Sequence, residues 1–201
     1  MPFLLMLAAI IVLAGAGITW VTSPYWHKHA ATAAPRDIGV IPVKPGAVAV
    51  AYVSPIRIEI PRLGAVAPIV DVSTLAGGEL DVPPNPQVVG WWKYGAKPGA
   101  AKGTAILDGH INYAGVDGVL SRIATLNPGD AVYIYGLNNG KNTRLPFKIT
   151  GVRTYSKQAL PYQEIFDQKS VGRVAIVTCG GPFDASTGNY RDNIVAFAVP
   201  A

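Results

Sequence analysis

The chain has 201 residues, of which 50% are hydrophobic, 14% are charged and one, Cys179, is a cysteine. A single cysteine excludes an internal disulfide framework and a cysteine-rich zinc site, and the length suits one domain with an appendage. The 17 Lys and Arg against 12 Asp and Glu give a net charge of +5, and the basic residues are scattered. This pattern favours an anionic wall or membrane surface as partner over nucleic acid.

Residues 3–22 form an apolar run without charge, FLLMLAAIIVLAGAGITWVT. About 20 apolar residues span the hydrocarbon core of a bilayer as one helix. Trp20, Tyr25 and Trp26 lie at or just past the end of the run, where aromatic rings favour the membrane interface. We therefore expect residues 1–22 to form a transmembrane anchor, with a cleaved signal peptide as the alternative.

Residues 23–54 are rich in Ala, Pro and other small residues and carry few charges, which predicts an extracytoplasmic linker. His27 and His29 form an H-x-H pair in this segment, but no third ligand lies nearby in the sequence. A solvated tether is therefore favoured over a metal site.

Residues 55–201 hold all but four of the charged side chains and are predicted to be the water-facing domain. Short β-rich runs separated by Gly and Pro recur through this part of the chain. The predicted strands are residues 56–60, 65–72, 104–108, 131–135, 144–155, 173–178 and 193–199.

Helix signals are scarce in the same domain. Asp117 is a candidate cap for a short helix with Leu120, Ile123 and Ala124 on one face, and a second short turn is expected near residues 163–168. About seven short strands with so few helices predict an all-β fold, a closed or nearly closed β-barrel.

Cys179 is the first residue with a candidate chemical role. It follows the apolar run 173–178 and precedes the sequence Gly180-Gly181-Pro182, where a strand opens into a Gly-rich loop. An unpaired cysteine outside the cytoplasm is unusual, which favours a nucleophile. The alternative is a small buried apolar side chain, the common state of free cysteines.

His110 follows the strand predicted at residues 104–108 and is the sole histidine of the predicted domain. A thiol with a pKa near 8.5 needs a base or a cationic neighbour at neutral pH, so a catalytic Cys179 would require His110. Asp108 and Asn112 lie two residues to either side, and either is a candidate to orient the imidazole. Hydrogen bonding within a turn or sheet is the alternative for both.

Arg191 precedes the last predicted strand. If residues 173–178 and 193–199 pair antiparallel, Cys179 and Arg191 lie at the same rim of the sheet. A guanidinium there can stabilise an oxyanion formed by thiolate attack on a carbonyl. The alternative is a surface arginine paired with Asp184 or Asp192.

At these segments the sequence resembles the sortases, the membrane-anchored cysteine transpeptidases of Gram-positive bacteria. V-T-C at 177–179 is similar to the end of the family's T-L-x-T-C pattern, and G-H-I-N at 109–112 is similar to its G-H segment. The strings VTCGGPFD and TGNYRDNIVAFA resemble the actinobacterial class F group, related to class E, in particular. The Leu of the pattern is replaced here, and no Lys or Arg precedes the apolar run.

The resemblance implies a closed eight-stranded sortase-type β-barrel with one or two short helices, preceded by a transmembrane helix. Cys179 would attack the Thr carbonyl of an LPxTG-like sorting signal and form a thioester, and Arg191 would stabilise the oxyanion. His110 would protonate the leaving Gly amine and then accept a proton from the incoming amine. Thr178 would contact the substrate or brace the site, and neither metal nor organic cofactor is implied.

The same resemblance implies partners and a location. The partners are sorting-signal peptides of secreted proteins, an amine acceptor such as a cell-wall precursor or a pilin Lys, and the membrane. The enzyme would cross the cell membrane once, with its catalytic domain outside the cytoplasm.

Two other classes of function remain open. The first is another extracytoplasmic cysteine peptidase, although papain-like and NlpC-type enzymes place Cys before His in the chain. L,D-transpeptidases carry a His shortly before their Cys, unlike this sequence. The second is a membrane-tethered wall-binding module with an incidental thiol, which predicts a buried Cys179 far from His110 and Arg191.

Overall fold

A computed structural model describes residues 36–42 and 51–201. The anchor predicted at residues 1–22 and most of the linker predicted at 23–54 lie outside these described residues. Within them, no helix has both the length and the apolar character needed to cross a bilayer.

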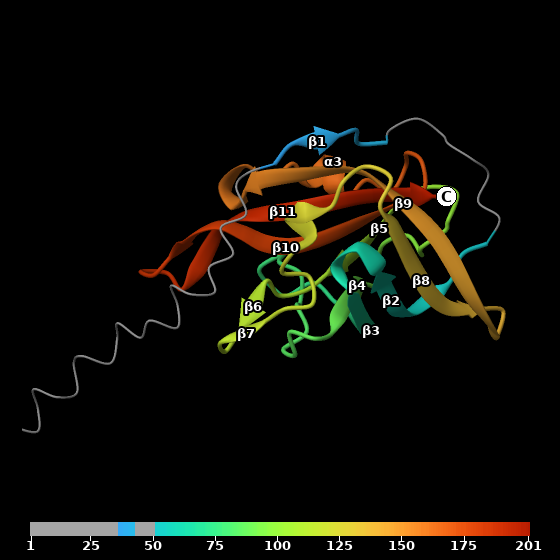
Figure 1. The fold of residues 1–201 in the computed structure, drawn as a ribbon, viewed down its shortest axis with the longest axis horizontal. Coiled ribbons are helices and arrows are strands. Elements are labelled where there is room, and N and C mark those ends of the chain that lie inside the picture. The colour runs from blue at the N-terminus through green and yellow to red at the C-terminus, as the bar shows by residue number, and fades with distance from the viewer. Residues whose placement is uncertain (1–35, 43–50) are drawn as a thin grey trace, which may run out of the picture. The chain divides into compact units, whose positions relative to one another are not determined.

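Eight strands of the described chain close into a β-barrel, as predicted (Figure 1). Around the barrel, the order is β9 (Lys141–Ser156), β11 (Asn189–Pro200), β10 (Arg173–Asp184), β5 (Thr104–Asp108), β4 (Val89–Trp92), β3 (Ala65–Val72), β2 (Ser54–Ile60) and β8 (Ala131–Asn138). The 16-residue strand β9 closes the ring because its first half pairs with β8 and its second half with β11. The pairs β3–β4 and β5–β10 are parallel, and the other barrel pairs are antiparallel.

All seven predicted strands are present, and most of them are longer than predicted, β10 most of all. β10 and β11 continue past the predicted ends into a hairpin whose paired residues reach Asp184 and Asn189. This hairpin, red in Figure 1, projects beyond the barrel wall. The strand β4 was not predicted, because its sequence Val-Gly-Trp-Trp is short and includes a glycine.

The helix predicted to be capped by Asp117 is wrong. Asp117 lies in β7 (Val116–Asp117), which pairs with β6 (Asn112–Tyr113) in a separate two-stranded sheet. The apolar side chains after it are buried as expected, but they lie on turns and a 3-10 segment at Ile123–Thr125. Among the described residues the one α-helix is the four-residue α3 (Tyr162–Ile165), near the turn predicted at 163–168.

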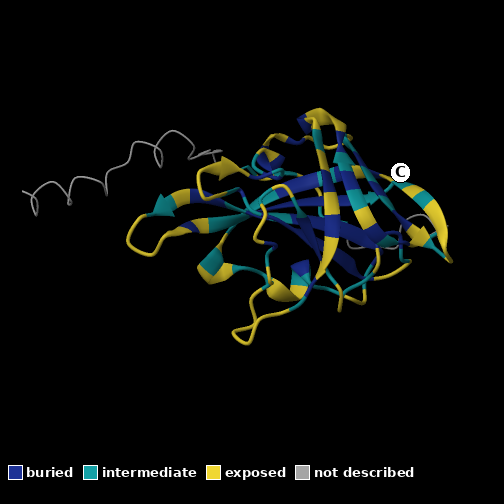
Figure 2. Cartoon of the chain, turned by 90° about the horizontal axis from the view of Figure 1, so that it is seen from below, coloured by how far each residue is buried: buried dark blue, intermediate teal, exposed yellow. Residues whose placement is uncertain are grey.

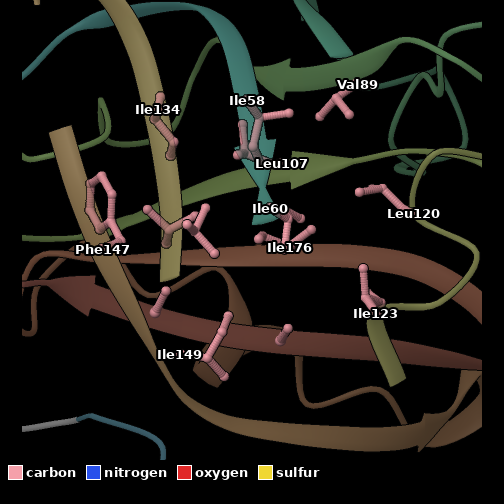
Figure 3. Packing of buried hydrophobic residues seen from close by; sticks show 14 of the residues in the cluster. Ile58, Ile60, Val89, Leu107, Leu120, Ile123, Ile134, Phe147, Ile149 and Ile176 are labelled. Atoms are coloured by element: carbon pink, nitrogen blue, oxygen red, sulfur yellow. The ribbon is translucent and has the colours of Figure 1, made fainter. Parts of the chain in front are cut away.

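The barrel buries one apolar cluster inside and a second on its outer face. Side chains from strands all around the ring, including Ile58, Leu107, Ile134 and Phe147, fill the interior (Figure 3). Figure 2 shows the buried residues concentrated in the central strands, with exposed residues at the hairpin ends. The outer cluster packs against α3 and consists of Ile106, Ile165, Ala175, Val195 and Phe197.

The strand β10 separates the two clusters. Its Val174 and Ile176 side chains belong to the interior, whereas Ala175 belongs to the outer cluster. The unbroken apolar run at 174–177 therefore reflects a central strand that is buried on both faces, as its sequence predicts.

Part of the segment predicted to be a linker contacts the barrel. The short strand β1 (Ile38–Gly39) pairs with β9 outside the closed ring. The Arg153 guanidinium donates hydrogen bonds to the backbone oxygens of Ile38 and Gly39, at 2.5 and 2.8 Å. Val53 is fully buried in the interior. These described residues are therefore packed on the barrel rather than solvated along their length.

Candidate functional site

The parallel pair β5–β10 brings His110 beside Cys179. Along the whole ladder, each residue of β10 pairs with the residue 69 positions earlier in β5, ending at Val177 and Asp108. The Gly109 amide continues the ladder by donating to the Val177 backbone oxygen at 3.2 Å. The same offset relates His110 to Cys179, so His110 follows the end of β5 at the level of Cys179, which lies within the neighbouring strand β10.

Thr178 holds this edge together from the interior side. Its side chain is 2% exposed, and its hydroxyl donates a hydrogen bond of 2.8 Å to the backbone oxygen of Gly109. The residue before His110 is thereby fixed to the residue before Cys179. This hydrogen bond is compatible with the bracing role expected for Thr178, and its role toward a substrate stays a prediction.

Cys179 is a free, partly exposed thiol on the outer face of β10. Side chains alternate along a strand, so Cys179 shares the face of Ala175 and Val177. The regular pairing with β11 continues to Gly180 and then breaks, in an irregularity between Gly180 and Phe183. A substrate backbone can approach here because the strand edge is no longer covered by a continuous ladder.

The imidazole ring of His110 is held by a stacking contact, and its pKa is shifted by its surroundings. Its imidazole stacks on the Tyr113 ring with centroids 4.8 Å apart and an interplanar angle of 19°. Burial lowers the pKa of His110 below its ordinary value, because the charged imidazolium loses solvation. The neutral imidazole is therefore the favoured form at neutral pH, which is the form that accepts a proton.

Tyr190 joins the His110 segment to the last strand, and its role was not predicted from the sequence. The Asn112 side-chain amide donates a hydrogen bond of 2.7 Å to the Tyr190 hydroxyl, and the Tyr190 ring contacts Phe183 edge-on. Tyr190 is 8% exposed, and burial raises the pKa of its hydroxyl, with the nearby charge of Cys179 adding to the effect. In the sequence, the signal that could have identified Tyr190 is its position next to Arg191 in N-Y-R-D.

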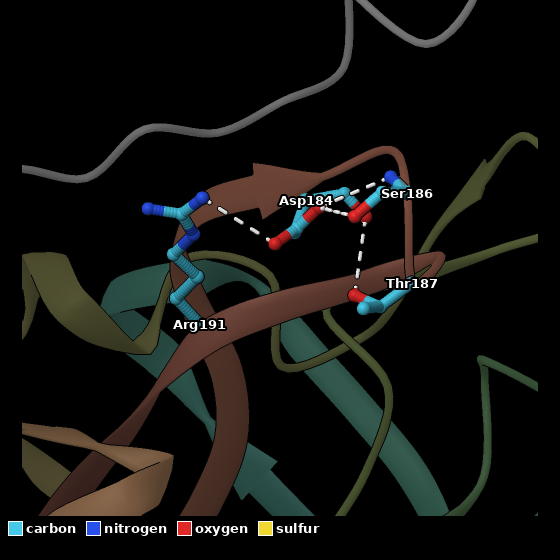
Figure 4. Close-up of polar contacts among 4 residues, drawn as sticks. All are labelled: Asp184, Ser186, Thr187 and Arg191. Carbon is cyan, nitrogen blue, oxygen red and sulfur yellow. Dashed lines mark hydrogen bonds and ion pairs between the residues drawn. The ribbon is translucent and has the colours of Figure 1, made fainter.

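Arg191 lies on the strand next to Cys179, but its side chain is directed to another partner. Cys179 pairs with Asn193 in the ladder, and Arg191 is two residues before Asn193 on the same strand. The guanidinium is 66% exposed and forms a 3.3 Å ion pair with Asp184 across the hairpin (Figure 4). The Ser186 hydroxyl and amide hold the same carboxylate, so the hydrogen bonds from Ser186 lower the pKa of Asp184 most.

The structure thus brings His110 and Cys179 together by backbone register and leaves Arg191 at the same rim with a separate partner. Within the described ranges no hydrogen bond or ion pair joins these three side chains directly. In those ranges there is also no group of three or more His, Cys, Asp or Glu residues arranged to hold a metal ion.

Asp108, the last residue of β5, carries a carboxyl group in an unusual environment. It is 3% exposed, and within the described chain neither side-chain oxygen has a hydrogen-bond partner from another residue. Burial is the main cause that raises the pKa of Asp108 to about 7, and the negative charge of Asp81 is the second cause. A carboxyl in this environment changes its protonation state near neutral pH.

A family model described as "Sortase domain" matches residues 58–201 of the chain. Among curated proteins, no sequence matches it. Solved structures with a similar fold include a sortase C from Clostridium perfringens with the C-terminal cell wall sorting motif (16% identity, TM-score 0.52). That match covers 75% of this chain and 72% of the other.

Two further solved sortases have a similar fold. Sortase E1 from Streptomyces coelicolor, with a tripeptide in its active site, is 19% identical with a TM-score of 0.50, over 77% of this chain and 90% of the other. The SrtA sortase from Actinomyces oris is 20% identical with a TM-score of 0.50, over 80% and 86%. At these identities the structural matches support the fold, and the family model supports the family.

Proposed function

The chain belongs to the sortase family, the cysteine transpeptidases, and from this premise we propose that Cys179 is its nucleophile and His110 its general acid and base. The observation that carries the proposal is the constant 69-residue offset of the parallel β5–β10 ladder, which leads to His110 beside Cys179. A thiol with a neutral imidazole at the same strand edge has the partner that thiol chemistry at neutral pH requires.

In the proposed reaction, Cys179 attacks the Thr carbonyl carbon of an LPxTG-like sorting signal while its proton passes to His110. The C–N bond to Gly breaks as His110 returns that proton to the leaving amine, and a thioester remains on Cys179. An incoming amine then attacks the thioester carbon, its proton passes to His110, and the C–S bond breaks. His110 finally returns a proton to the sulfur.

Arg191 is the proposed oxyanion donor, and this role requires a change of partner. In the structure its guanidinium is paired with Asp184, with both groups at the exposed rim. A surface ion pair contributes little stability, so a bound peptide can displace Asp184 at low cost. Five guanidinium N–H donors then suit a carbonyl oxygen that develops charge.

We further propose an enzyme class, a membrane anchor and an amine acceptor. The C-terminal strings point to a class F or class E enzyme, and residues 1–22 to a membrane anchor with the barrel outside the cytoplasm. The acceptor is a primary amine of a cell-wall precursor or a pilin. The sortase C structure with a cell wall sorting motif supports a peptide of that kind as the first substrate.

The full-length chain in detergent, incubated with quenched LPxTG-type peptides and an amine, tests this function. We expect peptide cleavage, an amine-linked product, and an intact mass that shows the acyl group on Cys179. Cys179→Ala should abolish all three signals, whereas Thr143→Ala, on the distant β8–β9 hairpin, should retain them. No cleavage of any sorting-type peptide, together with an inert Cys179, would favour the non-catalytic wall-binding module.

A further inference from the structure

Asp108 shares the outer barrel face with the candidate nucleophile. It pairs with Val177 in the β5–β10 ladder, and Ile106, two residues earlier, belongs to the outer apolar cluster. Since side chains alternate, Asp108 and Cys179 lie on the same face as Val177. The carboxyl is therefore buried next to the reacting groups, on the side that a substrate would approach.

A glycine in the adjacent strand makes room for this carboxyl. Gly90 pairs with Asp108, and a Cβ atom at Gly90 would lie 2.2 Å from Asp108 Oδ1. The same Cβ would lie 2.8 Å from a Val72 methyl carbon. The Asp108 carboxyl thus occupies the space that a side chain at position 90 would fill.

The ionisable groups around Asp108 in the described residues are few. Asp81, from the loop before β4, acts on it as a like charge, whereas β4 and β10 present Gly90 and Val177 opposite it. His110 lies two residues beyond Asp108 in the chain, and Cys179 lies within β10, two residues after Val177. Within residues 36–42 and 51–201, no cation forms an ion pair with this carboxylate, although burying an unpaired charge is costly.

We propose that Asp108 is a positioning residue that acts through His110, its carboxylate balancing the imidazolium that forms when His110 takes up a proton. This inference rests on the proposed function. Two residues along an extended backbone separate Asp108 from His110, about 7 Å, whereas the diagonal to Cys179 is about 8 Å. A negative charge at Asp108 therefore favours the imidazolium more than it disfavours the thiolate.

The effect of the Asp108 charge on His110 is expected to differ between acylation of Cys179 and transfer of the acyl group to the amine. When Cys179 loses its proton to His110, the thiolate itself is the counter-ion of the imidazolium. In the thioester the sulfur is bonded to the acyl carbon and carries no charge. When the amine then attacks and its proton passes to His110, the sulfur no longer supplies a counter-charge, and the buried Asp108 carboxylate is placed to supply one. Amine transfer therefore depends on Asp108 more than acylation does.

The test compares the full-length wild type with Asp108→Asn, a near-isosteric change whose folding is checked by circular dichroism. We expect transfer to slow about tenfold at pH 8 with acylation changed less, so that the thioester accumulates in intact-mass spectra. The wild-type transfer rate should rise with an inflection near pH 7, and Asp108→Asn should lack that inflection. Equal transfer rates and identical pH profiles would overturn the inference.

Two matched variants sharpen the result. Asp81→Asn should retain the inflection but move it to lower pH, because Asp81 raises the pKa of Asp108. Asp71→Asn, an exposed carboxylate on β3, should reproduce the wild-type profile. A profile altered equally by Asp71→Asn would assign the effect to net charge and overturn the role of Asp108.

Alkylation of Cys179 by iodoacetamide between pH 5 and pH 9 provides a readout without a peptide. The wild-type rate should show the inflection near pH 7 that Asp108→Asn lacks, and superimposable curves would overturn the inference. If no peptide forms a thioester with the wild type, the proposed function fails, and the alkylation curves still decide the role of Asp108.

Discussion

At the residue scale, the rim of the site holds a guanidinium that is already occupied. Arg191 and Asp184 form an ion pair, and Ser186 supports the carboxylate from the other side. The sequence left open whether Arg191 serves an oxyanion or a surface carboxylate. The structure shows the surface pair, and catalysis by Arg191 requires that the pair be exchanged for substrate.

Substitution of Asp184 tests this exchange. Asp184→Asn removes the charge that holds Arg191, so kcat/KM for a sorting peptide is expected to rise about twofold, the value of a weak exposed pair. Arg191→Ala should lower kcat about 100-fold, the usual effect of losing an oxyanion donor. Ser186→Ala, which removes one hydrogen bond to Asp184 and leaves the ion pair in place, serves as the control. An unchanged kcat in Arg191→Ala would exclude Arg191 from the reaction.

Asp108 also predicts how stability depends on pH. Its folded-state pKa of about 7 lies above the unfolded value near 3.9, so the folded chain binds the proton more tightly. The free energy of unfolding should therefore fall as pH rises from about 4 to 7, by up to about 4 kcal/mol. Urea unfolding at pH 5 and pH 8 measures this loss. Asp108→Asn should lose less stability over the same interval, and an equal loss would contradict the assignment.

At the element scale, the short strand β4 limits the site from one side. Gly90 leaves room for Asp108, and Trp91 of the same strand is buried in the barrel interior. A methyl group at position 90 would meet both Asp108 and Val72, so a small residue is required where β4 passes β5.

Gly90→Ala is therefore expected to destabilise the protein by about 1–3 kcal/mol through overpacking. Combining it with Asp108→Ala removes the closer of the two clashes. The double variant should thus be more stable than the sum of the single changes predicts, as measured by urea unfolding. Strict additivity would show that the two residues do not share this space.

Alternating and continuous apolar sequence patterns predicted most strands, because each pattern depends only on residues close together in the sequence. The run at 174–177 predicts a strand buried on both faces, and β10 is such a strand. The helix at Asp117 failed because its apolar spacing extends over little more than one turn, too short to stabilise a helix against β6–β7 pairing.

The site was predicted less completely than the strands. The order of His110, Cys179 and Arg191 identified three candidates, but chain order does not encode which strands pair in parallel. The β5–β10 register and the contact of Tyr190 with Asn112 join segments distant in sequence, and these depend on the closed ring. The local motif therefore identifies the candidate residues, whereas the barrel determines how they lie relative to one another.

At the scale of the whole molecule, residues 36–42 add a strand to the outside of a closed ring. The backbone of β1 accepts two hydrogen bonds from Arg153, and the Arg36 guanidinium donates to the Ala124 backbone oxygen at 3.1 Å. These contacts fasten the approach to the barrel onto β9 and the 3-10 segment at Ile123–Thr125.

Two truncated chains measure this contribution. A fragment of residues 36–201 retains the β1 contacts, whereas residues 51–201 lack them. We expect the shorter fragment to lose about 1–3 kcal/mol, which corresponds to a fall in Tm of about 3–10 °C for a domain of this size. Arg153→Ala in the longer fragment should cause part of the same loss. Equal melting temperatures of the two fragments would show that β1 adds no stability.

The parallel ladder between β5 and β10 also has a consequence for the order of folding. Its partners are 69 residues apart, and contacts of such long range form slowly because a large loop must close first. His110 therefore reaches Cys179 only when β5 and β10, neighbours in the ring but distant in the chain, have paired. If His110 is the base of Cys179 as proposed, a nascent or partly folded chain lacks the assembled pair, and the appearance of activity reports that the β5–β10 ladder has formed.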